Sequence, residues 1–184
     1  MPSFKDLLEL HVRLDDLFLE HQRALLRLDL DCAANTLREY TSKILAHIRD
    51  EEMLMLPFYR HRVKAPVGGS ADIFLREHEK LKRFLSLFEE EIKKIHNMAD
   101  LERGVLFLID SQHLFKRLLV HHDTRERKTL YPLLDEVTTE AERESLFARL
   151  ELSTGCEDFP AATESNHQGE IRENSRRNVF ARSY

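Results

Sequence analysis

Two stretches of this chain repeat one arrangement of side chains that can bind metal ions. In each stretch a histidine is followed by a glutamate four residues later and by a proline ten residues later. The first copy is His47, Glu51 and Pro57, and the second, 75 residues further on, is His122, Glu126 and Pro132. Because positions i and i+4 lie on one face of a helix, each His/Glu pair can direct an imidazole and a carboxylate at a single point. Two such pairs on facing helices would form a dinuclear metal site.

Both pairs lie on stripes of apolar residues that recur at alternating intervals of three and four, as in amphipathic helices. Such stripes are normally apolar throughout, because a buried ion without a partner costs several kcal/mol. Polar residues that interrupt the stripes are therefore the candidate metal ligands. They are His11, His47, Glu51, His78, His122 and Glu126.

The first predicted helix carries two stripe histidines, His11 and His21. If the first turn centres near residue 29, His11 and His47 each lie 18 residues from it, so antiparallel helices place them at one level. We therefore expect His11 to be the ligand. His21 stays the alternative, and if His11 binds the metal we expect His21 to be a core histidine or a hydrogen-bond donor to a ligand.

Four imidazoles and two carboxylates suit iron or manganese, with the carboxylates bridging two ions. Zinc is a poorer match, because its tetrahedral sites need fewer ligands for each ion. Ferritin-like centres use Glu-x-x-His at a spacing of three, the reverse of the order found here. Two divalent ions against two carboxylates leave a net positive charge, which favours a bridging oxide or hydroxide and leaves positions open to dioxygen, peroxide or nitric oxide.

Acidic residues that adjoin the candidate ligands are also potential site residues. Their phase on the predicted helices turns them sideways, so we expect ordinary surface charge for most of Glu52, Glu77, Glu79 and Asp123. Tyr40 lies two turns before His47 on the inward stripe, and we expect it to pack in the core.

The elements that must position these side chains are predicted to be helices. The stripes and turn signals predict helices over about 4–28, 31–62, 70–96, 101–135 and 139–150. Ser3 with Asp6 and Thr139 with Glu142 have the spacing of helix N-caps, and Asp31 is a third candidate cap. The two prolines of the repeat lie inside helices and should kink them. We expect an all-α, up-down-up-down four-helix bundle with a short extra C-terminal helix over 1–150, and a disordered polar tail over 151–184.

Composition excludes several classes of function. The formal net charge of −5, with acids and bases interspersed, argues against nucleic acid as a partner. No apolar run approaches the roughly 18 to 20 residues of a membrane helix, and the N-terminus lacks signal-peptide order, so we expect a cytoplasmic protein. Cys32 and Cys156 form no Cys-x-x-Cys pair, which argues against a disulfide scaffold or a thiolate zinc site.

The segments HIRDEEMLMLP and HHDTRERKTLYP, with His11 before them and His78 in LREHEKL between them, resemble a hemerythrin-like (HHE cation-binding) domain over about residues 5–135. The resemblance implies a non-haem di-iron centre inside an up-down-up-down bundle. Carried over to the matching positions, it implies the ligands His11, His47, Glu51, His78, His122 and Glu126.

The chain departs from the dioxygen-carrying hemerythrins at two positions. Those proteins supply two histidines one turn apart on the third helix, where this chain has Phe74 before His78. They also bridge with an aspartate five residues after the fourth-helix histidine, whereas Glu126 follows His122 by four. Four histidines with two glutamates are closer to hemerythrin-like proteins that repair iron centres under nitrosative stress, although this chain lacks their N-terminal cysteine-containing segment.

These patterns favour a metal-binding protein over an enzyme. The first hypothesis is a di-iron protein that binds or senses dioxygen or a related diatomic, which would enter beside Phe74, where the coordinating histidine is missing. Reaction with nitric oxide or peroxide, or repair of iron centres, is the alternative. A metal-free helical interaction module is the third. The polar tail and the flanking histidines leave room for a homodimer contact.

Overall fold

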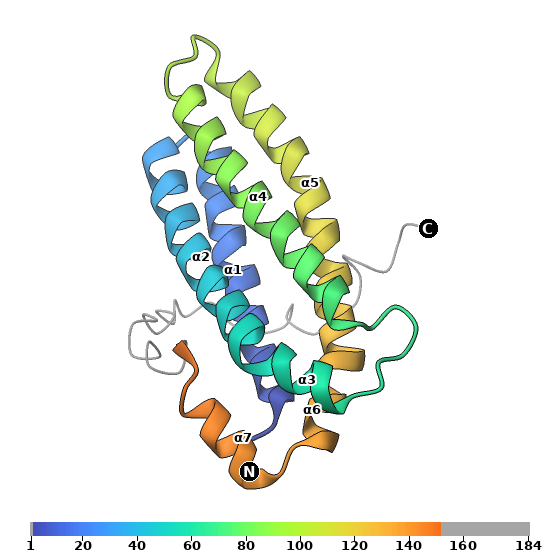
Figure 1. The fold of residues 1–184 in the computed structure, drawn as a ribbon. Coiled ribbons are helices and arrows are strands. Elements are labelled where there is room, and N and C mark those ends of the chain that lie inside the picture. The colour runs from blue at the N-terminus through green and yellow to red at the C-terminus, as the bar shows by residue number, and fades with distance from the viewer. Residues whose placement is uncertain (1, 152–184) are drawn as a thin grey trace, which may run out of the picture.

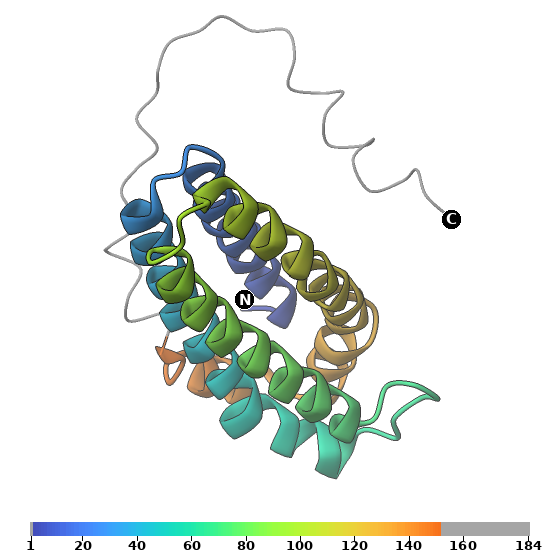
Figure 2. The same ribbon diagram turned by 90° about the horizontal axis from the view of Figure 1, so that it is seen from above.

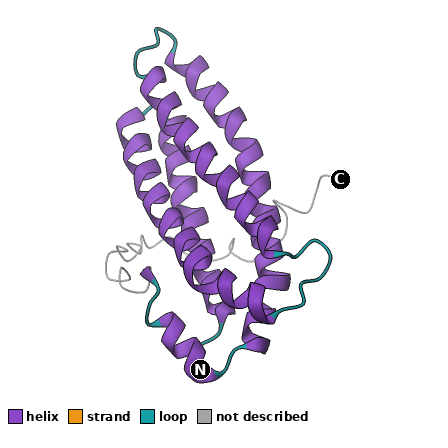
Figure 3. Cartoon of the chain, viewed as in Figure 1, coloured by secondary structure: helices purple, strands orange, loops and turns teal. Residues whose placement is uncertain are grey.

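Helices make up the ordered core of the computed structural model, which describes residues 2–151 (Figures 1 and 3). A 3₁₀ turn (Phe4–Leu7) leads into the elements α1 (Leu8–Leu26), α2 (Leu30–Asp50), α3 (Leu56–Arg62), α4 (Ala71–Ile95), α5 (Leu101–Arg125), α6 (Tyr131–Val137) and α7 (Glu140–Phe147). The four long helices run up-down-up-down and surround a common core (Figure 2). The predicted all-α bundle with a short C-terminal helix is confirmed. Residues 152–184, which hold nearly all of the predicted tail, lie outside the described residues, so the domain division remains a prediction.

The predicted helix starts are confirmed at both ends of the bundle and corrected at α2. Ser3 with Asp6 and Thr139 with Glu142 form reciprocal capping boxes. At α2 the cap is Asp29, whose side chain accepts from the backbone N–H of Cys32. The expected cap at Asp31 was wrong because Leu28 takes a left-handed conformation, with φ of 58°, and the helix starts two residues earlier than the pattern indicated.

The two repeated prolines produce π-helical turns, a feature that the expected kinks did not include. One π turn spans Glu51–Met55 and the other spans Glu126–Leu130, so each begins at a glutamate of the repeat. The N–H of Leu56 donates to the carbonyl of Glu51, and that of Tyr131 donates to the carbonyl of Glu126, a spacing of five residues. A proline has no N–H and its ring clashes with the carbonyl four residues before it, and the wider turn removes that clash.

Two apolar clusters fill the bundle, one on each side of the level of the candidate ligands. The larger includes Phe18, Tyr40, Phe88 and Phe115. The smaller lies toward α7 and includes Phe4, Met55, Tyr59, Phe74, Tyr131 and Leu146. In each long helix and the turns that continue it, the candidate ligands lie between residues of the larger cluster and residues of the smaller cluster. The predicted packing role of Tyr40 is confirmed, since its ring lies 4.9 Å from that of Phe18.

The short helix α7 closes the end of the bundle that carries the smaller cluster (Figure 1). The rings of Phe147 and Phe4 lie 5.5 Å apart, and the Arg143 guanidinium donates to the backbone carbonyls of Pro2 and Asp135. Within the described residues, no helix combines the length and the apolar character needed to cross a bilayer.

Phe115→Ala tests the larger cluster. Phe115 is fully buried, with ring centroids 5.2 Å from Phe18 and 5.4 Å from Phe88. We expect its truncation to lower the free energy of unfolding by about 3–5 kcal/mol. The neighbouring Leu114 is 59% exposed, so Leu114→Ala should change the stability by no more than about 0.5 kcal/mol. Denaturant unfolding of the metal-free protein measures both, and equal losses in the two variants would contradict the assignment of the core.

Candidate metal centre

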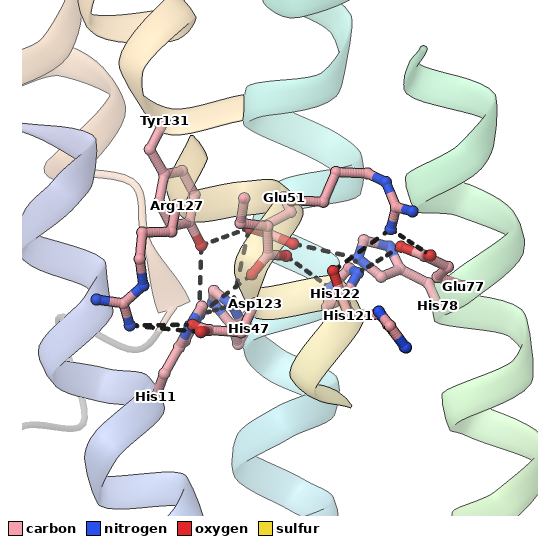
Figure 4. Close-up of polar contacts among 12 residues, drawn as sticks. His11, His47, Glu51, Glu77, His78, His121, His122, Asp123, Arg127 and Tyr131 are labelled. Carbon is pink, nitrogen blue, oxygen red and sulfur yellow. Dashed lines mark hydrogen bonds and ion pairs between the residues drawn. The ribbon is translucent and has the colours of Figure 1, made fainter. Parts of the chain in front are cut away.

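All six candidate ligands lie in one cluster between the two apolar clusters (Figure 4). Every one of them is buried except His11, which is half-buried. The cluster has two overlapping groups, in each of which the potential ligand atoms lie within 4.8 Å of one another. One group is Glu51, His78, His122 and Glu126, and the other is His11, His47 and Glu126.

The four imidazoles form two pairs. In the first pair the Nε2 atoms of His11 and His47 lie 2.9 Å apart, and in the second pair those of His78 and His122 lie 3.2 Å apart. Two nitrogens bound at right angles to one ion, at about 2.1 Å each, would lie about 3 Å apart. Each pair therefore has the spacing of two ligands of a single metal ion.

The two glutamates lie between the first pair and the second pair. One oxygen of Glu51 is 3.7 Å from an Nε2 of the first pair, and the other is 3.2 Å from an Nε2 of the second. The oxygens of Glu126 have the corresponding distances of 3.6 Å and 2.6 Å. Each carboxylate thus turns one oxygen toward each pair, which is the arrangement of a bridging ligand.

Three of these four carboxylate oxygens lack a hydrogen bond. Oε2 of Glu51 and both oxygens of Glu126 are buried, and none has a hydrogen-bond partner among residues 2–151. Imidazole nitrogens are close to them, but not in the direction of an N–H···O bond. Because an unsatisfied buried polar group costs about 1–3 kcal/mol, and more when charged, these oxygens need another partner. Cations between the two pairs would satisfy all of them, so the donor set fits the metal that the sequence predicted.

A ring of carboxylates behind the histidines corrects one sequence prediction. Three histidines donate from Nδ1 to an acidic side chain on a neighbouring helical segment. The pairs are His11 with Asp123 (2.7 Å), His78 with Glu52 (3.1 Å) and His122 with Glu77 (3.0 Å). These acids were expected to carry surface charge, and that expectation was wrong because a sideways position in a bundle faces the next helix. It holds for Glu79, which pairs with Lys82 at 3.1 Å on the surface.

The carboxylate ring prepares the histidines for metal binding. An Nδ1–H that donates to a carboxylate fixes the tautomer and leaves the Nε2 lone pair free for a cation. The acids are themselves held by cations, since Arg125 lies 2.5 Å from Glu77 and Lys82 lies 3.0 Å from Glu52. The orientation of three of the four imidazoles is therefore set before any metal arrives.

Tyr131 is a site residue that the sequence patterns missed. Its hydroxyl donates to Glu51 at 2.7 Å and lies 3.3 Å from Nε2 of His11 (Figure 4). In the first copy of the repeat the equivalent position is Leu56, so the internal repeat gave no warning of a polar residue here. The signal that could have found Tyr131 is the proline after it, which produces the π turn that places it.

His21, the alternative ligand of the first helix, and Phe74 both lie outside the ligand cluster. His21 bonds through Nδ1 to the carbonyl of Ala33 at 2.8 Å and through Nε2 to the side chain of Gln112 at 2.8 Å. It is a hydrogen-bonded core histidine outside the ligand cluster. Phe74 is fully buried, and its ring lies edge-on at 6.2 Å from that of His122.

A cavity of 610 Å³ reaches the cluster along α1, α2 and α5. His11, His47, His122 and Glu126 line its inner end. Phe74 is not among the residues that line this cavity, and the expected entry of a ligand beside Phe74 stays a prediction. The open side of the centre is the side of α1 and α5.

Burial and mutual charge shift the pKa values of the cluster strongly. Burial lowers the pKa of His47 to about 3. Burial also opposes the charged form of His122, but the negative charge of Glu126 and the hydrogen bond to Glu77 outweigh it and raise the pKa to about 10. Burial, together with the charge of Glu51, raises the pKa of Glu126 to about 7. In the metal-free protein the cluster therefore retains protons where cations would bind.

Comparison with known families agrees with this site. The model of the hemerythrin HHE cation binding domain matches residues 3–134, a span that contains all six candidate ligands. Comparison with curated proteins and with solved structures gave no match. The family match and the buried His/Glu cluster together indicate a cation-binding protein.

Glu77→Gln tests the carboxylate ring. The amide can still accept from His122, but the negative charge that favours cation binding is lost, so we expect metal affinity to fall by about 10- to 100-fold. Glu79→Gln, two residues further along α4, removes an exposed charge and should leave the affinity unchanged. His122→Ala and Glu51→Ala should each lose most of the bound metal. Anaerobic titration of the metal-free variants with ferrous ion measures these affinities, and equal affinities for the two glutamine variants would refute a role of Glu77.

Metal binding should release protons. At pH 7 His122, with a pKa of about 10, carries a proton, and Glu126, with a pKa of about 7, carries about half of one. A cation displaces these protons, so metal affinity should rise as the pH increases through neutrality. We expect more than one proton released per chain at pH 7, measured as the difference in binding heat between buffers of different ionisation enthalpy. Binding heats that do not depend on the buffer would contradict this protonation pattern.

Proposed function

We propose that this chain, which belongs to the hemerythrin HHE cation binding domain family, is a non-haem di-iron protein that binds or senses dioxygen or a related small diatomic. The observation that carries the proposal is the position of the two glutamates. Each turns one oxygen toward the first histidine pair and the other toward the second pair. This symmetry supports two ions held by shared carboxylates better than a single ion.

The donor set favours iron. Imidazole and carboxylate ligands together suit iron, and they also accept manganese. When bound, the two ions supply open coordination positions and electrons for a small ligand. Glu51 and Glu126 would neutralise two of the four positive charges of two divalent ions, which favours a bridging oxide or hydroxide.

The side chains around the centre control protons and water. Tyr131 holds its hydroxyl proton between Glu51 and the first pair, at 2.7 Å from the carboxylate, where it can donate to a ligand bound nearby. Phe74 fills the position of the additional histidine of the dioxygen carriers with an apolar ring, which keeps water away and adds no ligand. The second pair is therefore left with an open position.

Phe74 also favours a second candidate function. With four histidines and no seventh ligand, the centre is more open than that of the reversible carriers, and an open centre is suited to reaction with nitric oxide or peroxide and to repair of iron centres. A metal-free interaction module is disfavoured, because it would leave three of the four oxygens of Glu51 and Glu126 buried without a hydrogen-bond donor among residues 2–151.

Anaerobic reconstitution with ferrous ion tests the proposed function. We expect about two irons per chain, because each histidine pair has the nitrogen spacing of one ion. Exposure to dioxygen should then produce the charge-transfer bands of an oxo-bridged pair. Addition of dioxygen, nitric oxide or peroxide to the reduced protein separates a reversible adduct, expected for the binding function, from turnover, expected for the reactive alternative. Failure to retain iron under these conditions would overturn both and leave the metal-free module.

A further inference from the structure

The cavity that reaches the candidate metal centre is too large for a diatomic ligand alone. Its volume of 610 Å³ lies in the range of pockets that bury organic molecules, roughly 300–1,000 Å³. A diatomic is comparable to a water molecule, which occupies about 30 Å³ in the liquid. Most of the cavity is therefore available to a second and larger ligand.

Apolar side chains form the middle of the cavity. Four helices contribute them, with Leu14 and Phe18 of α1, Tyr40 and Ile44 of α2, Leu81 of α4 and Leu119 of α5 among them. Leu19 and Val120 also line the cavity and are 42% and 46% exposed, which places its opening to solvent between α1 and α5. An occupant that bridges this region needs an apolar body.

The positively charged side chain of Lys116 lies at the end of the cavity that is remote from the metal centre. The Nζ of Lys116 is 3.4 Å from the side-chain oxygen of Gln22, and both residues line the cavity. Gln22 is held in turn by its amide, which donates to Gln112 at 2.9 Å. Between residues 2 and 151, no carboxylate forms an ion pair with Lys116. Its charge is therefore available to an anionic group of a ligand.

Four carboxylates also line the cavity. Asp123 and Glu126 lie at the level of the centre, where Asp123 bonds to His11, and Asp15 and Asp16 lie about one turn beyond His11 on α1. They disfavour an anionic group beside them. Lys116 is the one lysine or arginine among the residues that line the cavity, so the anionic group of a ligand has its ion-pair partner there.

We infer that this cavity binds an amphipathic monocarboxylate, with its carboxylate at Lys116 and Gln22 and its alkyl chain along the apolar wall toward the metal centre. On α5, Lys116 precedes His122 by six residues and Glu126 by ten, a distance of about 9–15 Å along the helix. With carbon–carbon bonds of about 1.5 Å in a zigzag, a chain advances about 1.3 Å per carbon, so about 7–12 carbons fill that length. A medium-chain fatty acid has this length and this chemistry.

Calorimetric titration of the full chain with decanoate, below its micelle concentration, tests the inference. Affinity should rise from hexanoate to decanoate by up to about fourfold for each added methylene, because each is buried against the apolar wall. The gain should stop once the chain reaches the metal centre, near twelve carbons. Lys116→Met keeps the apolar stem and removes the charge, so decanoate should bind at least about tenfold more weakly, while decanol should be unaffected.

Two controls keep the result interpretable. Lys80→Met removes an exposed lysine of α4 and should leave decanoate affinity unchanged. Leu119→Trp should block decanoate and leave the iron content intact. Absence of decanoate binding in protein that holds iron would overturn this inference alone. Binding of decanoate by protein that retains no iron would support the fatty-acid site and refute the proposed function. The inference rests on the proposed function only for the identity of the metal centre at the inner end of the cavity. Equal decanoate affinity in Lys116→Met would overturn the assigned carboxylate site.

Discussion

Two carboxylates buried side by side require positive charge between them, and the rest of the structure is arranged around that requirement. Glu51 and Glu126 have no exposed surface, and three of their four oxygens have no hydrogen-bond donor among residues 2–151. The four imidazoles surround them in two pairs, and outer acids hold three of the imidazoles in the tautomer that accepts a cation. In the absence of metal the same oxygens raise the pKa of His122, so a proton takes the place of a cation.

The backbone meets this requirement through the two prolines of the repeat. A regular α-helix through Pro57 or Pro132 would bring the proline ring against a carbonyl of the preceding turn. The π turns that avoid this contact begin at Glu51 and Glu126, so the helices are wider where the bridging carboxylates leave the backbone. The change of phase also turns Tyr131 inward, into contact with Glu51. One local constraint thus sets both a bridging ligand and the hydroxyl beside it.

The fold and the ligand cluster could be predicted from the sequence because both depend on periodicity along single helices. His47 and Glu51 share a face at any packing angle, and His11 could be chosen over His21 by depth alone. The outer acids could not be predicted, since the bond between Glu77 and His122 depends on which side of α4 faces α5. Tyr131 was hidden because its orientation follows from the π turn and not from a spacing of three or four. The cavity was hidden for a similar reason, because it is a property of four helices together.

The position of the ligands between two separate apolar clusters has a mechanical consequence. A polar layer separates the larger cluster from the smaller cluster along each helix. The buried carboxylates of this layer need cations as partners. A cation in this layer would link the two halves of the bundle, and without it the layer would be the least stable part of the helices. The half that contains the smaller cluster includes Phe4, whose ring packs against that of Phe147 in α7. Metal binding is therefore expected to stiffen the junction between the two halves of the bundle.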